Sequence, residues 1–271
     1  MKGLNIQGNS KTARSKNGRY VIIKTGPFSC ALLIDNQPPQ EYHDTHGRTI
    51  QSIAVSDTGL IAISLDSIGS SIVRLFNGGL NVIFLVYDEP WQLRFGTGLS
   101  LTPKGDILAI GSPGESKVYT YDLDTAGSIL KYTKKLIVGP NFEGFGWKVG
   151  LSEGGNSLAI ASPSSNVDSL DVGAINVYAL VGGTWESLDT LLYGTEDSLR
   201  IGIGGVAIDD QHGIVSVQDN NLDHKKTFMV RVSYEWYSQL HFFWLPSNLL
   251  SLLTAGSVAL NLRRSASPGC R

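Results

Sequence analysis

A glycine-containing polar turn that recurs along the chain, with apolar stretches on both sides, constrains the fold more than any other feature of this sequence. Copies of the turn surround Gly18, Gly59, Gly105, Gly155, Gly213 and, in a weaker form, Gly256. Successive copies are separated by 41, 46, 50, 58 and 43 residues. Self-similarity at such intervals indicates a repeat architecture, in which each repeat is one supersecondary unit packed on its neighbours. We therefore predict tandem units at residues 10–47, 48–92, 93–141, 142–197 and 198–245, a partial unit at 246–262 and a flexible tail at 263–271.

Each unit is predicted to contain four short strands. Two apolar strands flank the turn, and the second has an apolar–small–apolar core, as in Ile61-Ala62-Ile63. Alternating apolar and polar residues, typical of a half-buried strand, follow at 116–122, 174–180 and 227–234. A more variable apolar segment completes the unit at 80–87, 129–138, 184–193 and 237–245. Four antiparallel strands per repeat are the pattern of a β-propeller blade. This pattern predicts an all-β, single-domain β-propeller over residues 1–262 with five to six four-stranded blades.

The turn glycines have a structural role in this prediction. A tight turn between strands often requires a positive φ, which glycine adopts without the steric cost of a Cβ atom. We therefore assign all six glycines to structural turns and none of them to a binding site.

Charge and targeting signals limit the classes of partner and the expected location. The formal net charge is −2 and the lysines and arginines are scattered, whereas a nucleic-acid-binding domain normally has a basic face and a pI above about 9. The basic run at residues 131–135 is interpreted as the solvated side of an outer strand. Residues 1–18 lack the apolar core of a signal peptide. We predict no nucleic-acid partner and a location in the cytoplasm or in a virion.

The two middle units contain a more specific motif. Its copies are Phe95-Gly96 followed by Gly111-Ser112-Pro113, and Phe145-Gly146 followed by Ala161-Ser162-Pro163. These units resemble FG-GAP repeats, the blades of integrin α-subunit propellers. The resemblance covers residues 93–194, and in the next unit Ile201-Gly202 replaces Phe-Gly. It implies a propeller that serves as an interaction or assembly module.

The same resemblance raises the question of calcium, which FG-GAP blades often bind in loops of alternating aspartates. Calcium requires six to eight oxygen ligands, and the polar turns of this chain contain too few carboxylates to supply them. Asp168 and Asp171 could supply two more carboxylates, but we interpret them as solvated residues of a loop. His43 and His46 flank Asp44 in an H-x-x-H segment, which we interpret as a polar connection between blades. We predict no metal ion and no cofactor, with calcium unsupported by the loop sequences.

No residue pattern nominates a catalytic centre, and we predict that the chain is not an enzyme. The predicted function is a non-enzymatic scaffold for protein–protein interaction or assembly, such as a structural subunit of a larger particle like a virion. Binding on a rigid scaffold usually resides in its loops, here the long loops at 162–173 and 218–226. The candidate binding residues in them are Asn166, Asp168, Asp171, Asp219, Asn220, Asn221 and Asp223.

Two alternatives remain open. A carbohydrate-binding lectin or glycosidase-like propeller would use carboxylates such as Asp57 and Asp106 around an axial pocket, although these are also natural turn residues. A membrane-anchored adhesion head would use residues 240–262, the most apolar segment of the chain. Because Pro246 and Asn248 interrupt that segment, we favour its docking on a protein partner or a neighbouring subunit over a membrane span.

Overall fold

The computed structural model describes residues 12–67, 70–87, 94–124, 131–139, 144–167, 170–194, 200–209, 214–218, 227–231 and 261–264. Within these residues the regular structure is entirely β-strand, with no helix. The chain divides into two compact units, Met1–Gly139 and Pro140–Arg271, next to the predicted boundary between the third and fourth repeats.

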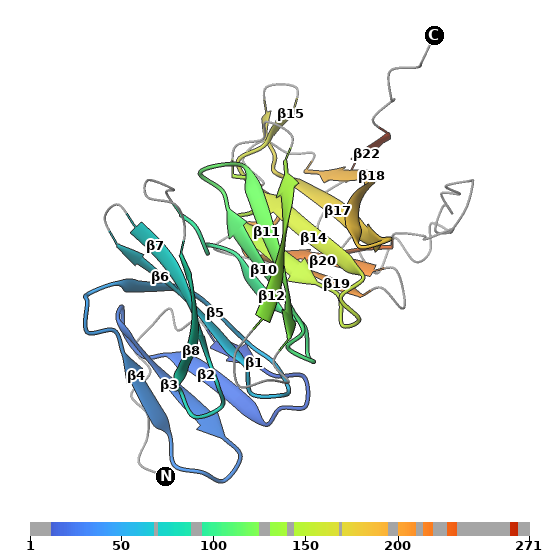
Figure 1. Cartoon of the computed structure of the whole chain (residues 1–271). Coiled ribbons are helices and arrows are strands. Elements are labelled where there is room, and N and C mark those ends of the chain that lie inside the picture. Colours follow the sequence, from blue (N-terminus) through green and yellow to red (C-terminus); the bar gives the residue numbers. More distant parts are fainter. Residues whose placement is uncertain are drawn as a thin grey trace. The chain divides into compact units, whose positions relative to one another are not determined.

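The first unit contains three four-stranded antiparallel sheets, each built from strands that are consecutive in the chain (Figure 1). The first sheet comprises β1 (Thr12–Arg14), β2 (Tyr20–Lys24), β3 (Ser29–Ile34) and β4 (Gln40–His43). The second comprises β5 (Thr49–Val55), β6 (Ile61–Ser67), β7 (Ser70–Phe76) and β8 (Val82–Tyr87), and the third comprises β9 (Leu99–Leu101), β10 (Ile107–Ser112), β11 (Lys117–Asp124) and β12 (Lys131–Val138). Each sheet lies within one of the first three predicted repeats.

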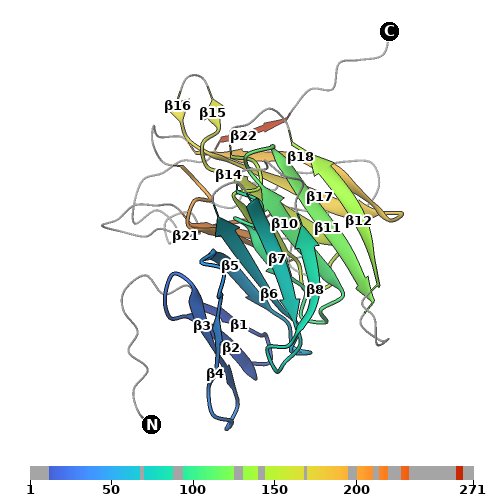
Figure 2. The ribbon, with the colours of Figure 1, turned by 60° about the vertical axis from the view of Figure 1, so that its left-hand side comes forward.

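The second unit contains the fourth and fifth repeats. The fourth-repeat sheet runs β13 (Lys148–Leu151), β14 (Ser157–Ser162), β17 (Ala174–Val181) and β18 (Thr184–Tyr193), and the hairpin of β15 (Asn166–Val167) and β16 (Leu170–Asp171) is inserted between β14 and β17. The fifth-repeat sheet contains β19 (Gly205–Asp209), β20 (Ile214–Gln218) and β21 (Thr227–Arg231). The last strand, β22 (Asn261–Arg264), pairs antiparallel with β18 and extends the fourth-repeat sheet by one strand (Figure 2).

A repeated sheet of four consecutive antiparallel strands is the blade of a β-propeller, so the predicted fold class is confirmed. Four blades have four strands from their own repeat, and the fifth has three strands among the described residues. Gly213, Gly256 and most of the partial unit at 246–262 lie outside the described residues. Arg263 and Arg264, at the start of the predicted tail, pair with the outer strand of the fourth blade.

The core lies between the faces of consecutive blades within each unit. One cluster joins the first and second blades through residues such as Ile22 and Ile63, and a second joins the second and third blades through Leu75 and Leu108. In the second unit, a third cluster lies between the fourth and fifth blades. Because alternate residues of a strand point to the same side, the apolar positions of one strand can supply these clusters.

The repeated turn contains a buried hydroxyl that the glycine pattern alone did not reveal. In the turns of the first four blades, a serine or threonine lies three residues before the glycine, and its oxygen accepts a hydrogen bond from a backbone N–H just beyond the turn. The four pairs, each 3.0 Å apart, are Ser15 with Tyr20, Ser56 with Leu60, Thr102 with Ile107 and Ser152 with Ser157. The φ angles of Gly18, Gly59, Gly105 and Gly155 are 75°, 84°, 74° and 72°, the sign expected for these turns. The hydroxyl and the glycine of a Ser/Thr-x-x-Gly segment together close the turn.

The turns of the first three blades are linked to one another through Asp57. Its carboxylate accepts a hydrogen bond from the backbone N–H of Asn17 at 2.8 Å, and its own N–H donates to the carbonyl of Pro103 at 2.8 Å. Beside it, a Cβ atom on Gly59 would lie 2.8 Å from the ring of Tyr20 in the first blade. The glycine therefore serves both the backbone conformation and the close approach of two turns.

The Phe-Gly pair of the third blade joins that blade to the second. Phe95 is buried, and its ring packs edge-on against a tyrosine ring of β11 with 5.8 Å between centroids. Gly96 faces the second blade, where an added Cβ atom would lie 2.3 Å from Ser64 Oγ. In the second unit, a Cβ atom on Gly202 would lie 2.6 Å from the Cβ atom of Ala161 in the fourth blade. The aromatic residue thus anchors its own blade, and the glycine permits close approach to the preceding one.

Removal of one turn hydroxyl tests its structural role. In a Thr102→Val variant the side chain keeps its shape, but the N–H of Ile107 loses its acceptor. Because a lost hydrogen bond with an unsatisfied donor costs about 1–3 kcal/mol, we expect the free energy of unfolding to fall by this amount in a denaturant titration. The control is Lys104→Ala, an exposed residue of the same turn, which should change it by less than about 0.5 kcal/mol. Equal losses would contradict the role of the hydroxyl.

Two glycine substitutions separate backbone strain from close packing. Gly47 has a φ of 70° and no heavy atom within 4 Å of an added Cβ, whereas Gly96 has a φ of 81° and the contact with Ser64. We expect Gly47→Ala to cost about 1 kcal/mol of stability from strain alone. Gly96→Ala should cost more than about 2 kcal/mol, because overpacking adds to the strain. Adding Ser64→Gly to Gly96→Ala should recover part of the loss, and a failure to recover any would argue against the proposed joint.

Candidate functional site

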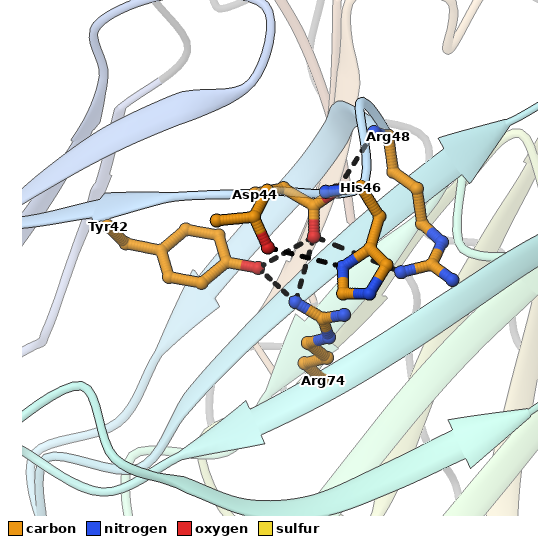
Figure 3. Close-up of polar contacts among 6 residues, drawn as sticks. Tyr42, Asp44, His46, Arg48 and Arg74 are labelled. Carbon is orange, nitrogen blue, oxygen red and sulfur yellow. Dashed lines mark hydrogen bonds and ion pairs between the residues drawn. The ribbon is translucent and has the colours of Figure 1, made fainter.

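A polar cluster around Asp44 lies where the first blade connects to the second (Figure 3). The side chain of Asp44, just after β4, is fully buried. Arg74 of β7 donates a hydrogen bond to Asp44 Oδ1 at 2.8 Å and another to the hydroxyl of Tyr42 at 2.5 Å. The backbone N–H groups of His46 and Arg48 donate to Asp44 Oδ2 at 3.2 and 2.9 Å. The cluster therefore ties the outer strand of the first blade to the third strand of the second.

The electrostatics of the cluster favour an ionised carboxylate. Burial alone raises the pKa of Asp44, but the N–H of Arg48 and the charges of Arg74 and Arg48 outweigh it and hold the pKa below its ordinary value of 3.8. Burial raises the pKa of the Tyr42 hydroxyl to about 12. A general acid or base works best when its pKa lies near the operating pH, and neither group meets this condition near pH 7. The arrangement suits a structural joint between blades.

The two histidines of this segment do not converge with Asp44 on a metal site. His43 and His46 are exposed, whereas Asp44 is buried and engaged by Arg74 and backbone N–H groups. Within the part of the chain that the structure describes, no group of three His, Cys, Asp or Glu side chains is placed to hold a metal ion. The geometry agrees with the interpretation of the H-x-x-H segment as a polar connection between blades. Sequence reasoning missed Arg74, because no local pattern links it to Asp44.

The predicted binding loops are described only in part. Asn166 and Asp171 lie opposite each other in the hairpin of β15 and β16. Outside the described residues lie Asp168, Asp219, Asn220, Asn221 and Asp223. Their role in binding stays a prediction.

Exposed apolar side chains gather on β12, the outer strand of the third blade. Tyr132, Leu136 and Val138 are 49%, 50% and 64% exposed. They alternate with their neighbours along the strand and share one face with Lys134, and we call these four residues the β12 face. The location of residues 131–135 on the solvated side of an outer strand agrees with the prediction. The sequence predicts a strand at 129–138 but does not reveal that several of its apolar residues are exposed.

The apolar C-terminal segment is placed only at its end. Residues 240–260 lie outside the described residues, and Asn261 and Leu262 belong to β22. Among the residues that the structure describes, there is no helix with the length and apolar character of a membrane span.

Comparisons with known proteins find similarity of fold alone. No protein-family model and no curated protein sequence matches the chain. The chain is similar to the structure of a proposed 6-phosphogluconolactonase from Bacteroides uniformis ATCC 8492, with a TM-score of 0.59 and 10% identity over 94% of this chain and 71% of that one. It is also similar to the β-propeller domain of Cps50 (Swd1) from Myceliophteria thermophila, with a TM-score of 0.49 and 12% identity over 83% of this chain and 74% of that one. Similarity at 10% identity concerns the fold and not the activity.

Loss of the Asp44 charge tests the joint between the first two blades. In an Asp44→Asn variant Arg74 keeps a largely buried charge without its counter-ion, so we expect a loss of about 3–5 kcal/mol in the free energy of unfolding. The control Asp35→Asn removes an ion pair with Arg19 in which the carboxylate is 58% exposed, and it should cost less than about 1 kcal/mol.

The pH dependence of this loss follows from the direction of the pKa shift. Because the pKa of Asp44 is lower in the folded chain than its ordinary 3.8, the carboxylate contributes stability above that value and loses it as the pH falls through the folded pKa. The difference between wild type and Asp44→Asn should therefore be full at pH 6 and shrink below about pH 4. A difference that is independent of pH would contradict an ionised Asp44.

Proposed function

We propose that this chain is a non-enzymatic propeller scaffold that binds a partner protein, and that the β12 face is its main contact surface. The observation that carries the proposal is the exposure of Tyr132, Leu136 and Val138 on one outer strand. Large apolar side chains that gather on a surface commonly mark an interaction site. Aromatic residues are also enriched in protein interfaces.

Three carboxylates of the described blades support a scaffold role, because they hold turns and blades together. Asp57 links the turns of three blades, and Asp106 accepts a hydrogen bond from the hydroxyl of Thr102 at 2.5 Å. Asp44 is engaged by Arg74. These contacts give the three carboxylates a role in packing and turn formation, which favours the binding role over a glycosidase-like one.

The rigidity of the third blade supports the choice of its outer strand. Lys134 Nζ lies 4.3 Å from the centroid of the Tyr119 ring, and Tyr132 packs on Tyr121 with 5.6 Å between centroids. The two tyrosines of β11 that carry these contacts are buried. A surface supported in this way loses little side-chain entropy on binding.

A photo-crosslinking amino acid at position 136, with one at position 181 as the control, identifies the partner in cells of the source organism. Val181 is the matched control, because it is an apolar residue that is 37% exposed on another blade. The captured protein is then produced and titrated against the purified full chain. We expect Leu136→Asp to weaken this binding at least about tenfold and Val181→Asp to leave it unchanged. The proposal would be overturned if the captured protein did not bind the purified chain. It would also be overturned if Leu136→Asp and Val181→Asp weakened the binding equally.

A further inference from the structure

We propose that the partner supplies an extended acidic segment that pairs with the outer edge of β12 as an additional strand. The inference rests on the proposed function and names the chemistry of the partner. It draws on three observations: the position of β12 in its sheet, the way in which the chain extends another of its blades, and the charges of β12.

The first observation concerns the edge of the sheet. The order in the third blade is β12-β11-β10-β9, so β12 pairs with β11 on one side and is the last strand on the other (Figure 2). Among the described strands, none pairs with the outer side of β12. Alternate residues of such a strand direct backbone N–H and C=O groups outward, where they can pair with another chain. At eight residues, β12 is long for an edge strand, whereas β4, the outer strand of the first blade, has four.

The second observation is that the chain itself extends a blade by adding a strand. β22 pairs with the outer strand of the fourth blade over four residues, from Thr190 opposite Arg264 to Tyr193 opposite Asn261. The two arginines of β22 lie opposite Leu191 and Thr190, so acidic residues do not face them in this pairing. The pairing of β22 with β18 is therefore a precedent for strand addition through the main chain, and not for charge matching. The outer strands of these blades are competent to accept a further strand.

The third observation is that β12 carries exposed basic residues. Lys131 and Lys134 are exposed, while Lys135 forms an ion pair with Asp122 at 2.5 Å. Opposite charges that lie directly across two paired strands stabilise the pairing, and like charges destabilise it. An added strand therefore requires acidic residues opposite Lys131 and Lys134. The basic β22 sequence is unsuited to this edge.

The β12 face defines the order of residues in the partner. In an antiparallel pairing, successive partner residues lie opposite Leu136, Lys135, Lys134, Thr133, Tyr132 and Lys131. Apolar side chains opposite Leu136 and Tyr132 would cover the exposed apolar area. The resulting pattern is apolar, any, acidic, any, apolar, acidic. Main-chain hydrogen bonds then provide affinity, and the alternate side chains provide specificity.

The test uses the full chain and a peptide that contains Val-Thr-Glu-Thr-Val-Glu, capped at both ends. Hydrogen exchange measured by mass spectrometry should show that the peptide slows exchange of the β12 amides and leaves the β4 amides unchanged. Lys134→Glu should weaken peptide binding about three- to tenfold. The same variant should bind the peptide in which lysine replaces both glutamates more tightly than wild type does. Lys104→Glu is the control, because it makes the same charge change at an exposed turn residue of the same blade.

The outcomes separate this inference from the proposed function. Three results would overturn the acidic-strand inference. The first is equal peptide binding by Lys134→Glu and Lys104→Glu, and the second is protection from hydrogen exchange elsewhere than at β12. The third is protection of β12 by an oligonucleotide but not by the peptide. If position 136 captures a partner that binds the purified chain while the peptide does not protect β12, the proposed function stands and strand addition is wrong. If neither the partner nor the peptide binds, both are wrong.

Discussion

The close approach of consecutive blades at one repeated backbone position is the constraint on which the rest of each unit depends. The position lies in the second strand of a blade, four residues after the residue whose backbone N–H donates a hydrogen bond to the turn hydroxyl. Ser64 occupies it in the second blade and Ala161 in the fourth. A glycine of the following blade packs against it in both cases, so a side chain larger than serine would force the blades apart. Because interiors are packed to crystal-like density, the small residue and the glycine constrain each other.

In the first blade a charged residue occupies the position at which the two blades approach closely. Its residue at this position is Lys24, whose Nζ donates a hydrogen bond to the carbonyl of Ile50 at 2.7 Å at the entry to the second blade. Burial lowers the pKa of Lys24, so the carbonyl helps to offset the lost hydration of its ammonium group. The Asp44–Arg74 pair lies in the same joint. The second blade lacks the Phe-Gly motif, and polar contacts take its place. Buried charges need such complete pairing, since an unpaired one is strongly destabilising.

The sequence predicts the parts of this fold that depend on local spacing. The recurrence of a glycine turn and the period-two segments place the strands well, and β18 occupies the predicted residues 184–193. The Asp44 cluster could not be predicted in this way, because Arg74 lies 30 residues further along the chain. Its position beside Asp44 depends on how two blades pack. The pairing of Arg263 and Arg264 with β18 is equally non-local. The exposed face of β12 is an intermediate case, because the sequence predicts a strand at 129–138 but the solvent exposure of its apolar residues depends on the position of the strand at the edge of the sheet.

Packing therefore restricts the residues of the inner strands of a blade more than those of its outer strand. β14, second in its blade, is buried at every position of Ser157–Ser162, and its residue Ala161 is limited in size by Gly202 of the fifth blade. β12 is last in its blade and has one buried residue, Ile137, so packing restricts its composition far less. An exposed edge strand with no function is expected to be short, or charged along its length, because an apolar edge invites aggregation. β12 has lysines at 131, 134 and 135, and it exposes apolar side chains at 132, 136 and 138. Packing does not require apolar residues at Tyr132, Leu136 and Val138, because their side chains are exposed. Selection for binding, and not for folding, therefore best explains the sequence of β12.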